Sequence, residues 1–203
     1  KLMSSPLTLK LDEIVTFIKD RQQNTGPFVV LIDGPAGSGK TTLGTMLSQV
    51  LGWSLVSMDD FFLPLDLRSE ERLSEPGGNV HYERFYQEVV EPIVKARNGD
   101  NVSPATYRLF SCITFDYAGE KTFDPNKPLI VEGSYSLHPY FKNYQDLGLF
   151  LCLDPETQAR RILARNGPEK AQIFRERWIP MENRYFDFYR ISDRADLIFK
   201  FLL

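Results

Sequence analysis

The stretch Gly34-Pro35-Ala36-Gly37-Ser38-Gly39-Lys40-Thr41 decides how this chain folds. It fills every fixed position of the phosphate-binding loop pattern G-x-x-x-x-G-K-[ST]. The apolar run at 28–32 before it predicts a buried strand, and residues 42–51 after it predict a helix that ends at Gly52. A glycine-rich turn that merely connects two elements is the alternative interpretation. The complete pattern, in the order strand, loop, helix, favours a site that binds a nucleoside triphosphate.

The loop offers three kinds of contact to a polyphosphate. Glycines let successive backbone N–H groups turn toward phosphate oxygens, and the N-terminus of the following helix adds positive potential. Lys40 is expected to contact the β- and γ-phosphates, and the Thr41 hydroxyl is expected to hold Mg²⁺. We therefore expect ATP to be bound by the loop and the residue after it, namely Gly34, Pro35, Ala36, Gly37, Ser38, Gly39, Lys40, Thr41 and Thr42.

The composition is that of one globular domain spanning residues 1–203. The chain has 203 residues, of which 42% are hydrophobic and 25% charged, and a formal net charge of −3. We expect no nucleic-acid partner, because no basic patch is visible, and no membrane association, because no apolar segment has membrane length. Cys112 and Cys152 lie far apart without metal-ligand spacing, which favours reduced thiols and a cytoplasmic location. Assembly into a homo-oligomer is left open.

Short apolar runs alternate with helical patterns along the chain, which is typical of a parallel sheet covered by helices on both faces. We predict an α/β fold of the P-loop NTPase class, a three-layer sandwich with a mostly parallel sheet. A small β-hairpin is expected at about 104–123 and a helical lid at about 155–177. Other strands are expected at 54–57, 128–133, 147–153 and 196–201, and helices at 11–19, 80–97, 155–165 and 171–190.

Acidic residues follow two of the expected strands, at the edge of the sheet where ligands gather. Asp59 and Asp60 come after the strand at 54–57, and Glu132 ends the strand at 128–133. A kinase needs a carboxylate to orient or deprotonate the accepting hydroxyl, and acids near its metal. A turn or a helix cap is the alternative role for each of these acids. Because successive side chains alternate on an extended segment, Asp60 is expected to point away from Asp59 and to serve structure.

Several segments resemble the uridine kinase and phosphoribulokinase family of P-loop kinases. Ser57-Met58-Asp59-Asp60-Phe61-Phe62 is similar to the S-x-D-x-F-[YF] segment of uridine kinases, and Ile130-Val131-Glu132-Gly133 to their V-x-E-G strand end. The segment from Asp154 to Arg165 resembles their arginine-bearing lid helix. The resemblance extends from about Phe28 to Phe199, and it includes Trp178-Ile179-Pro180 and Ala195-Asp196-Leu197-Ile198, which match their C-terminal helix and strand.

The resemblance implies an enzyme that uses ATP and Mg²⁺ to phosphorylate a hydroxyl of a small molecule. It implies that Asp59 is the catalytic base, a contact of the acceptor and an indirect partner of the metal. Glu132 and Thr41 are then metal-site residues. Lys40 and Arg165 are expected to stabilise the charge that develops in the transition state.

The acceptor pocket departs from the family pattern. Uridine kinases carry an Asp-His-Pro segment whose acid contacts the ribose, whereas this chain has Val80-His81-Tyr82. Their T-H-S-R stretch places a histidine on the base, whereas this chain has Ser111-Cys112-Ile113-Thr114. Their lid continues with an arginine pair around a glycine, whereas Asn166-Gly167-Pro168-Glu169-Lys170 follows here. The ATP half of the pattern is present and the acceptor half is not, so the acceptor stays unidentified.

Besides Asp59, four residues are candidates for contact with the acceptor: His81, Tyr107, Arg108 and Arg161. A cap or surface role is the alternative for His81, and packing in the hairpin is the alternative for Tyr107. Arg161 shares a helix face with the residue four positions later, and a solvated basic face is its alternative. Asp33, beside the phosphate loop, is expected to orient backbone groups without taking part in proton transfer.

Three other functions compete with a uridine kinase-like enzyme. The segment at 32–41 also resembles the start of cytidylate kinases, which suggests a nucleoside monophosphate kinase, although the segment at 57–62 does not look like theirs. The segment at 59–64 resembles the D-x-F-x-x-P segment of pantothenate kinases. A regulatory module that senses or hydrolyses ATP is the third. A guanine-specific switch is disfavoured, because Asn126-Lys127-Pro128-Leu129 lacks the acid of N-K-x-D.

Overall fold

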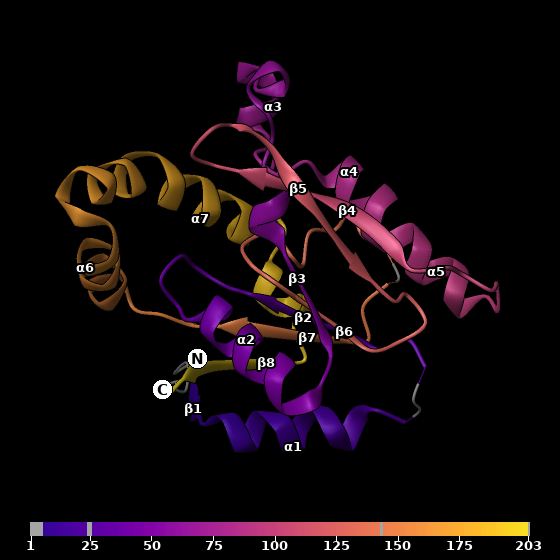
Figure 1. Ribbon diagram of the computed structural model, residues 1–203. Helices are drawn as coiled ribbons and strands as arrows, with labels where there is room; N and C mark the ends of the chain where they lie inside the picture. The colour runs from indigo at the N-terminus through magenta and orange to yellow at the C-terminus, as the bar shows by residue number, and fades with distance from the viewer. Residues whose placement is uncertain (1–5, 24–25, 143, 203) are drawn as a thin grey trace.

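The structure is a computed structural model, and it describes residues 6–23, 26–142 and 144–202. A six-stranded sheet with the order β1-β8-β7-β2-β6-β3 runs through its centre, and each pairing in this sheet is parallel (Figure 1). The parallel α/β sheet predicted from the sequence is confirmed. The strands are β1 (Leu7–Leu9), β2 (Val29–Asp33), β3 (Ser54–Ser57), β6 (Leu129–Glu132), β7 (Leu147–Leu151) and β8 (Leu197–Phe201).

The middle strands are apolar because both faces of the sheet are covered. Every residue of β2 and of β7 is buried. In β2, Val29 and Leu31 belong to one hydrophobic core, and Val30 and Ile32 belong to the other, as the alternation of side chains along a strand requires. The continuous apolar run before the phosphate loop therefore marks a strand with a core on each side.

Two long helices cover one face of the sheet. They are α1 (Leu11–Arg21) and α2 (Lys40–Leu51); in Figure 1, α1 lies below the strands, and α2 lies directly above α1 and overlaps the strands in this view. Ile14 and Ile18 of α1 pack with Leu43 and Leu47 of α2 in the core on this side. Ile14 and Ile18 are four positions apart, so they lie on the same face of α1, and this face is turned to the sheet.

The opposite face carries shorter helices and the predicted hairpin (Figure 1). The helices are α4 (Tyr82–Phe85), α5 (Glu91–Arg97) and α7 (Ile179–Phe188). The hairpin pairs β4 (Ala105–Ser111) with β5 (Asp116–Phe123) in antiparallel register and confirms the expectation at 104–123. Large aromatic side chains dominate this core, among them Phe61, Phe85, Tyr107, Tyr135, Tyr144 and Tyr185.

The lid region differs from the prediction of separate helices at 155–165 and 171–190. Helix α6 (Pro155–Ile173) instead continues across the expected gap, with a break at Gly167, where φ is +77°. Only glycine adopts this φ readily, and Pro168 then starts the second half of the helix, where its missing N–H is tolerated. A π-helical turn, η4 (Phe174–Trp178), connects α6 to α7.

Several short elements were not predicted. The strand β1, at one edge of the sheet, has three residues, too few to show a periodic pattern. The others are η1 (Met58–Phe61), η2 (Leu65–Leu67), α3 (Glu70–Ser74) and η5 (Ile191–Arg194). The helix expected at 80–97 is interrupted by a π-helical segment, η3 (Tyr86–Val90), just before Pro92. Among the described helices, none has the length and apolar character to cross a membrane.

Candidate functional site

The phosphate loop leaves the middle of the sheet at the carboxyl end of β2. Gly34 has a φ of +143°, and a Cβ there would lie 2.5 Å from the carbonyl oxygen of Leu151, so only glycine fits between the loop and β7. Helix α2 begins at Lys40, earlier than the predicted start at 42, with Gly39 as its cap. The first N–H groups of α2 therefore face the loop, where an anion is favoured.

Two polar side chains of the loop have the placement expected of phosphate ligands. The Lys40 Nζ donates a 2.9 Å hydrogen bond to the Pro35 carbonyl oxygen, so the ammonium lies over the loop. The Ser38 hydroxyl is buried and finds no hydrogen-bond partner among the described residues. Buried polar groups are nearly always paired in folded proteins, and an unpaired one at this place points to a ligand.

The lid holds the backbone of the loop from one side. The Gln158 Nε2 donates to the Ala36 carbonyl oxygen over 3.0 Å, and Arg161 Nη1 donates to the Gly37 carbonyl oxygen over 3.0 Å. Arg161, a predicted contact of the substrate, thus lies on the phosphate loop. Both residues belong to α6, so this helix is hydrogen-bonded to the backbone of the loop.

Glu182 of α7 supports the loop from the other side, and the sequence analysis missed it. Its Oε2 accepts a 2.9 Å hydrogen bond from the Ala36 N–H, and its Oε1 accepts a 2.5 Å hydrogen bond from the Ser134 hydroxyl. Glu182 is buried, which is unusual for a glutamate without such partners. No local signal marks it, because it lies 146 residues from Ala36 along the chain.

Glu132 and Thr41, the two predicted metal-site residues, lie in contact. The Thr41 hydroxyl donates to Glu132 Oε2 over 3.1 Å, and the Ser57 hydroxyl donates to Glu132 Oε1 over 2.7 Å. A Cβ at Gly44 would lie 3.0 Å from Glu132 Cγ, so this glycine gives the carboxylate its room against α2. Burial raises the pKa of Glu132, and the negative charge of Asp59 raises it further.

Asp59 and Asp60 occupy the turn η1, and this corrects one prediction. The segment is a 3₁₀ turn and not an extended strand, so the alternation expected to send Asp60 away from Asp59 does not apply. Burial raises the pKa of Asp59, whereas the charges of Lys40 and Arg165 lower it. The carboxylate of Asp59 is therefore within electrostatic reach of both the phosphate loop and the lid.

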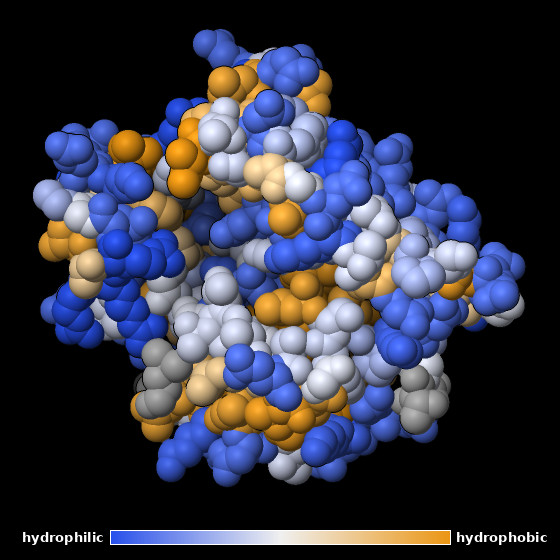
Figure 2. Space-filling model, viewed as in Figure 1, coloured by the Kyte–Doolittle hydropathy of each residue, from blue (hydrophilic) through white to orange (hydrophobic). Residues whose placement is uncertain are grey.

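Arg165 lies on the lid helix α6. Its Nε donates to the Asn166 side-chain oxygen over 2.8 Å, and its guanidinium lies 5.8 Å from the centre of the Phe174 ring. Figure 2 shows that the surface is hollowed, with hydrophilic side chains inside, between the lid elements and the hairpin. The structure thus brings the candidate base and the candidate lid arginine to the same side of the molecule.

The two hairpin candidates face in opposite directions, as neighbours on a strand do. The Tyr107 side chain is buried and stacks on the Phe61 ring, with 5.5 Å between the ring centres. Arg108 turns the other way, where its guanidinium forms a 3.1 Å ion pair with Glu88 and lies over the Tyr117 ring. The Tyr107 ring therefore contacts the η1 turn that carries Asp59, whereas the Arg108 guanidinium is paired with Glu88.

His81, the remaining candidate, borders a cavity of about 430 Å³ together with Leu63, Arg72 and Glu83. The imidazole is half-buried, and burial lowers its pKa. Its backbone N–H donates to the Phe61 carbonyl oxygen over 2.6 Å, and His81 caps α4, as the alternative interpretation expected.

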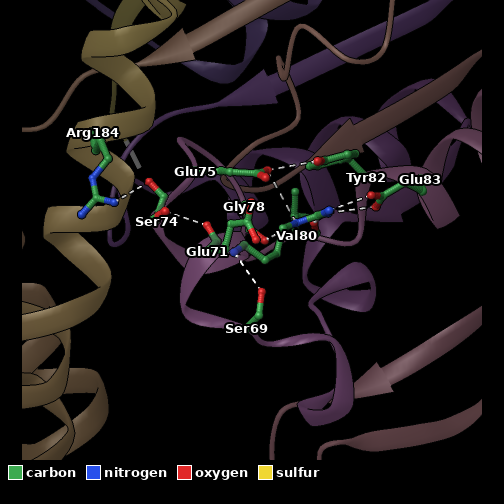
Figure 3. A network of polar contacts seen from close by, with 10 residues as sticks. Ser69, Glu71, Ser74, Glu75, Gly78, Val80, Tyr82, Glu83 and Arg184 are labelled. Atoms are coloured by element: carbon green, nitrogen blue, oxygen red, sulfur yellow. Dashed lines mark hydrogen bonds and ion pairs between the residues drawn. The ribbon is translucent and has the colours of Figure 1, made fainter.

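A polar network fixes the segment between η1 and α4. Arg72 donates to both carboxylate oxygens of Glu83, over 2.6 Å and 2.8 Å. Figure 3 shows the Tyr82 hydroxyl turned toward Glu75, and Arg184 of α7 reaching Ser74. These contacts connect α3 to α4 and to α7.

Asp33 organises the backbone behind the loop, as predicted. It is fully buried, and its carboxylate accepts hydrogen bonds from the backbone N–H groups of Gly34, Tyr135 and Leu137 and from the Tyr185 hydroxyl. Burial raises its pKa to about 6, although these hydrogen bonds from the backbone and the charge of Lys40 lower it in part.

Known proteins resemble the chain in sequence and in structure. No protein-family model matches it. It is 27% identical over 166 residues to a cytidylate kinase of Archaeoglobus fulgidus, which covers 80% of this chain and 77% of that protein. It is 26% identical over 167 residues to uridine kinase-like protein 4 of Arabidopsis thaliana, which covers 80% of this chain and 34% of that protein.

Among solved structures, a possible uridine kinase from Bacillus stearothermophilus has a TM-score of 0.68 to this chain at 20% identity, and the match covers 93% of this chain and 96% of that one. This likeness confirms the predicted fold. The relatives found by sequence are kinases, which supports kinase activity. The chain has the fold of the P-loop kinases, uridine kinase-like proteins among them.

Proposed function

We propose that this chain transfers the γ-phosphoryl group of ATP, with Mg²⁺, to a hydroxyl of a small metabolite. The observation that carries the proposal is the place of Asp59 in the chain: it comes two residues after Ser57, whose hydroxyl holds the Glu132 carboxylate beside Thr41, and the charges of Lys40 and Arg165 both act on the Asp59 carboxylate. An accepting hydroxyl has to meet a base and the γ-phosphoryl at once, and this carboxylate is near the groups expected on either side of that phosphoryl.

In the proposed reaction, Asp59 accepts the proton of the acceptor hydroxyl while the hydroxyl oxygen forms a bond to the γ-phosphorus. The bond from the γ-phosphorus to the oxygen that bridges it to the β-phosphate breaks, and its electron pair stays with ADP. Lys40 and Arg165 stabilise the charge on the transferring group. Because the pKa of Asp59 is raised, its carboxylate is a stronger base than an aspartate with an ordinary pKa.

The donor set fits Mg²⁺. Thr41 offers a hydroxyl, Glu132 a carboxylate already hydrogen-bonded to that hydroxyl, and Asp59 a second carboxylate nearby. Hard oxygen ligands are the ones that Mg²⁺ takes, usually one or two carboxylates with phosphates and water. When bound, the ion neutralises charge on the β- and γ-phosphates.

A phosphate acceptor is the second candidate, favoured by the similarity to a cytidylate kinase. Against it stand the two neighbouring carboxylates of the η1 turn, Asp59 and Asp60, which would repel a nucleoside monophosphate at the acceptor side. Pantothenate remains among the hydroxyl acceptors to be tested, and a module that only senses ATP remains the non-transferase alternative.

ADP release across a panel of acceptors tests the proposal. The panel holds uridine, cytidine, pantothenate, glycerate, sugars and sugar phosphates as hydroxyl acceptors, and CMP and UMP as phosphate acceptors. We expect a hydroxyl acceptor to raise ADP release well above the rate with ATP alone, and Asp59→Asn to abolish the increase. An increase with CMP or UMP only, or one that Asp59→Asn leaves intact, contradicts the proposal. Equal ADP release with and without every acceptor favours the regulatory alternative.

A further inference from the structure

A buried histidine that the proposed reaction does not use lies in the segment between β6 and β7. His138 is 5% exposed, in a core made mainly of aromatic side chains. The rings in contact with it are those of Tyr82, Phe141, Tyr185 and Tyr189. Burying a polar ring in such a core is unfavourable unless its nitrogens are satisfied, so the contacts of this imidazole call for an explanation.

Hydrogen bonding fixes the tautomer of the His138 ring. The Tyr140 N–H donates to Nδ1 over 3.1 Å, so Nδ1 carries no proton and the neutral ring carries its proton on Nε2. Burial lowers the pKa of His138 to about 4, although the nearby Pro76 carbonyl raises it in part. Nε2 finds no partner in good hydrogen-bond geometry among the described residues. The ring is therefore uncharged at neutral pH, with its N–H beside the backbone of Pro76.

A tight turn at residues 75–79 packs against this edge of the ring. Gly77 has a φ of +74°, and a Cβ there would lie 2.6 Å from His138 Cδ2 and 2.8 Å from Nε2. Gly78 is confined from the other side, since a Cβ there would lie 1.9 Å from the Arg72 carbonyl oxygen. The turn is therefore held between α3 and the His138 ring, with no room for a side chain at either glycine.

The turn leads directly into the segment that pairs with the end of the η1 turn. Two backbone hydrogen bonds, of 3.1 Å and 2.6 Å, join residues 79–81 to residues 61–63. Phe62 and Val80 form an antiparallel bridge between these two bonds. The paired segment begins two residues after Asp59, so a displacement of the turn at 75–79 would be transmitted to the part of the chain that carries the candidate base.

The His138 ring also stacks on the residue that supports the phosphate loop. The Tyr185 ring lies 5.8 Å from it, centre to centre, with 20° between the planes. The Tyr185 hydroxyl donates to Asp33 over 2.8 Å, and Asp33 accepts a 2.7 Å hydrogen bond from the Gly34 N–H, at the start of the loop. His138 therefore lies between the support of the phosphate loop and the segment that holds Asp59.

We propose that His138 is a positioning residue that sets the place of the η1 turn, and with it Asp59, relative to the phosphate loop. It acts through the turn at 75–79 on one side and through Tyr185 on the other. A misplacement of about 1 Å far from the reacting atoms can slow an enzyme about a hundredfold. ATP binding should depend little on His138, because Glu182 and α6 hold the loop independently. This inference rests on the proposed function and adds to it a residue that aligns its two sides.

The test compares His138→Asn and His138→Gln with a matched core substitution, Tyr144→Leu. Asparagine keeps an acceptor near the place of Nδ1 but leaves a gap beside Gly77, and glutamine reaches further into that gap. Tyr144→Leu removes a buried ring from the same segment, one that packs on Phe85 and Phe141.

Phosphoryl transfer is measured in a single turnover at saturating ATP and acceptor, and the rate is expressed per molecule that binds ATP in a calorimetric titration. This removes any loss that comes only from unfolded protein. His138→Asn should be about ten- to hundredfold slower than the wild type, with nearly unchanged ATP affinity. His138→Gln should regain part of the rate, and Tyr144→Leu should keep it.

A double-substitution cycle tests the contact itself without any acceptor. Gly77→Ala puts a Cβ against the His138 ring, so it should lower the free energy of unfolding more in the wild-type background than in His138→Asn, where the gap can receive it. The strain that alanine has at this φ is present in both backgrounds and cancels. Additive losses would show that the ring does not hold the turn, and would overturn the inference.

Normal transfer in folded His138→Asn, or equal slowing in Tyr144→Leu, overturns the inference while the proposed function stands. Should His138→Asn fail to fold, His138→Gln takes its place in this comparison and should be slowed by a smaller factor. If the wild type phosphorylates none of the hydroxyl acceptors, the proposed function fails and the inference with it.

Discussion

The Thr41 hydroxyl donates a 3.1 Å hydrogen bond to Glu132 Oε2, across a separation of 91 residues. The bond joins the first turn of α2 to the end of β6, a strand that pairs directly with β2. The Ser57 hydroxyl at the end of β3 holds the other oxygen of the same carboxylate. The strands β2, β6 and β3 are neighbours in the sheet, and their carboxyl ends therefore lie around one cluster of side-chain oxygen atoms.

This arrangement predicts that Glu132 supports metal binding more than stability. Glu132→Gln should raise the Mg²⁺ concentration needed for half-maximal ATP turnover by about ten- to hundredfold, as loss of a metal-associated acid commonly does. The measurement is turnover against Mg²⁺ concentration at saturating ATP. Glu120→Gln, an exposed change on β5, is the matched control. An unchanged Mg²⁺ requirement in folded Glu132→Gln contradicts the assignment.

Glu182 should matter for both the loop and the fold. Glu182→Ala removes the partner of the Ala36 N–H and leaves the Ser134 hydroxyl only its 3.5 Å contact with the Gly34 carbonyl oxygen, so the free energy of unfolding should fall by about 1–3 kcal/mol. Urea denaturation measures this loss, and titration with ATP should show weaker binding because the loop is held less firmly. Glu169→Ala, an exposed change on the lid, should alter neither property. ATP binding of wild-type strength in Glu182→Ala would show that the loop needs no such support.

Asp33 makes the stability of the protein depend on pH. Its pKa is about 6 in the folded state, against an ordinary value of 3.8. A raised pKa means that the unfolded chain releases this proton first as the pH rises. The Asp33 contribution to the free energy of unfolding should therefore fall between pH 4 and 6, by up to about 3 kcal/mol, and should be unchanged below that range.

Denaturation of the wild type and Asp33→Asn at several pH values isolates this effect. The unfolding free energy of the wild type minus that of Asp33→Asn should fall as the pH rises through this window, whatever its value at low pH. Asp20→Asn, an exposed change on α1, controls for the other carboxylates. A difference that stays constant with pH would mean that Asp33 keeps an ordinary pKa.

Lys40→Ala should abolish tight ATP binding while the fold survives. Lys40 supplies a point charge to the phosphates, and the hydrogen bond of its Nζ among the described residues goes to a loop carbonyl. Calorimetric titration with ATP and thermal unfolding measure the two properties together. Lys95→Ala, which removes an exposed lysine of α5, should bind ATP as the wild type does. Full activity in folded Lys40→Ala would remove the phosphate loop from the mechanism.

The fold could be predicted largely because the phosphate loop constrains its neighbours. A buried strand before Gly34 and a helix after Lys40 follow from local pattern, and the parallel sheet follows from repeated strand–helix alternation. The η1 turn could not be predicted, since Met58–Phe61 is too short for a periodic signal and its 3₁₀ shape depends on packing against the hairpin. For this reason the extended backbone, on which the expected opposition of Asp59 and Asp60 rested, was wrong.

The residues of the candidate site could be predicted where they lie near the end of a strand. They could not be predicted where they hold the site by hydrogen bonds from a distant part of the sequence. Glu132 and Thr41 could be placed together because parallel strands bring their carboxyl ends to one edge. Glu182 gave no signal, because its partners are a backbone N–H and a serine in other parts of the chain. Tyr107 could be named but not interpreted, since only the structure shows its hydroxyl to be buried and without a hydrogen-bond partner among the described residues.

The rate of phosphoryl transfer in Asp59→Asn tests the central claim most directly. It is measured in a single turnover, with the hydroxyl acceptor that the panel identifies, beside Asp60→Asn and with the ATP affinity of each protein determined separately. A positioned base contributes about 10²–10⁴ to the rate, so Asp59→Asn should be slower by that factor with little change in ATP affinity. A nearly normal rate in Asp59→Asn, with Asp60→Asn the crippled variant, would show that the base has been assigned to the wrong residue.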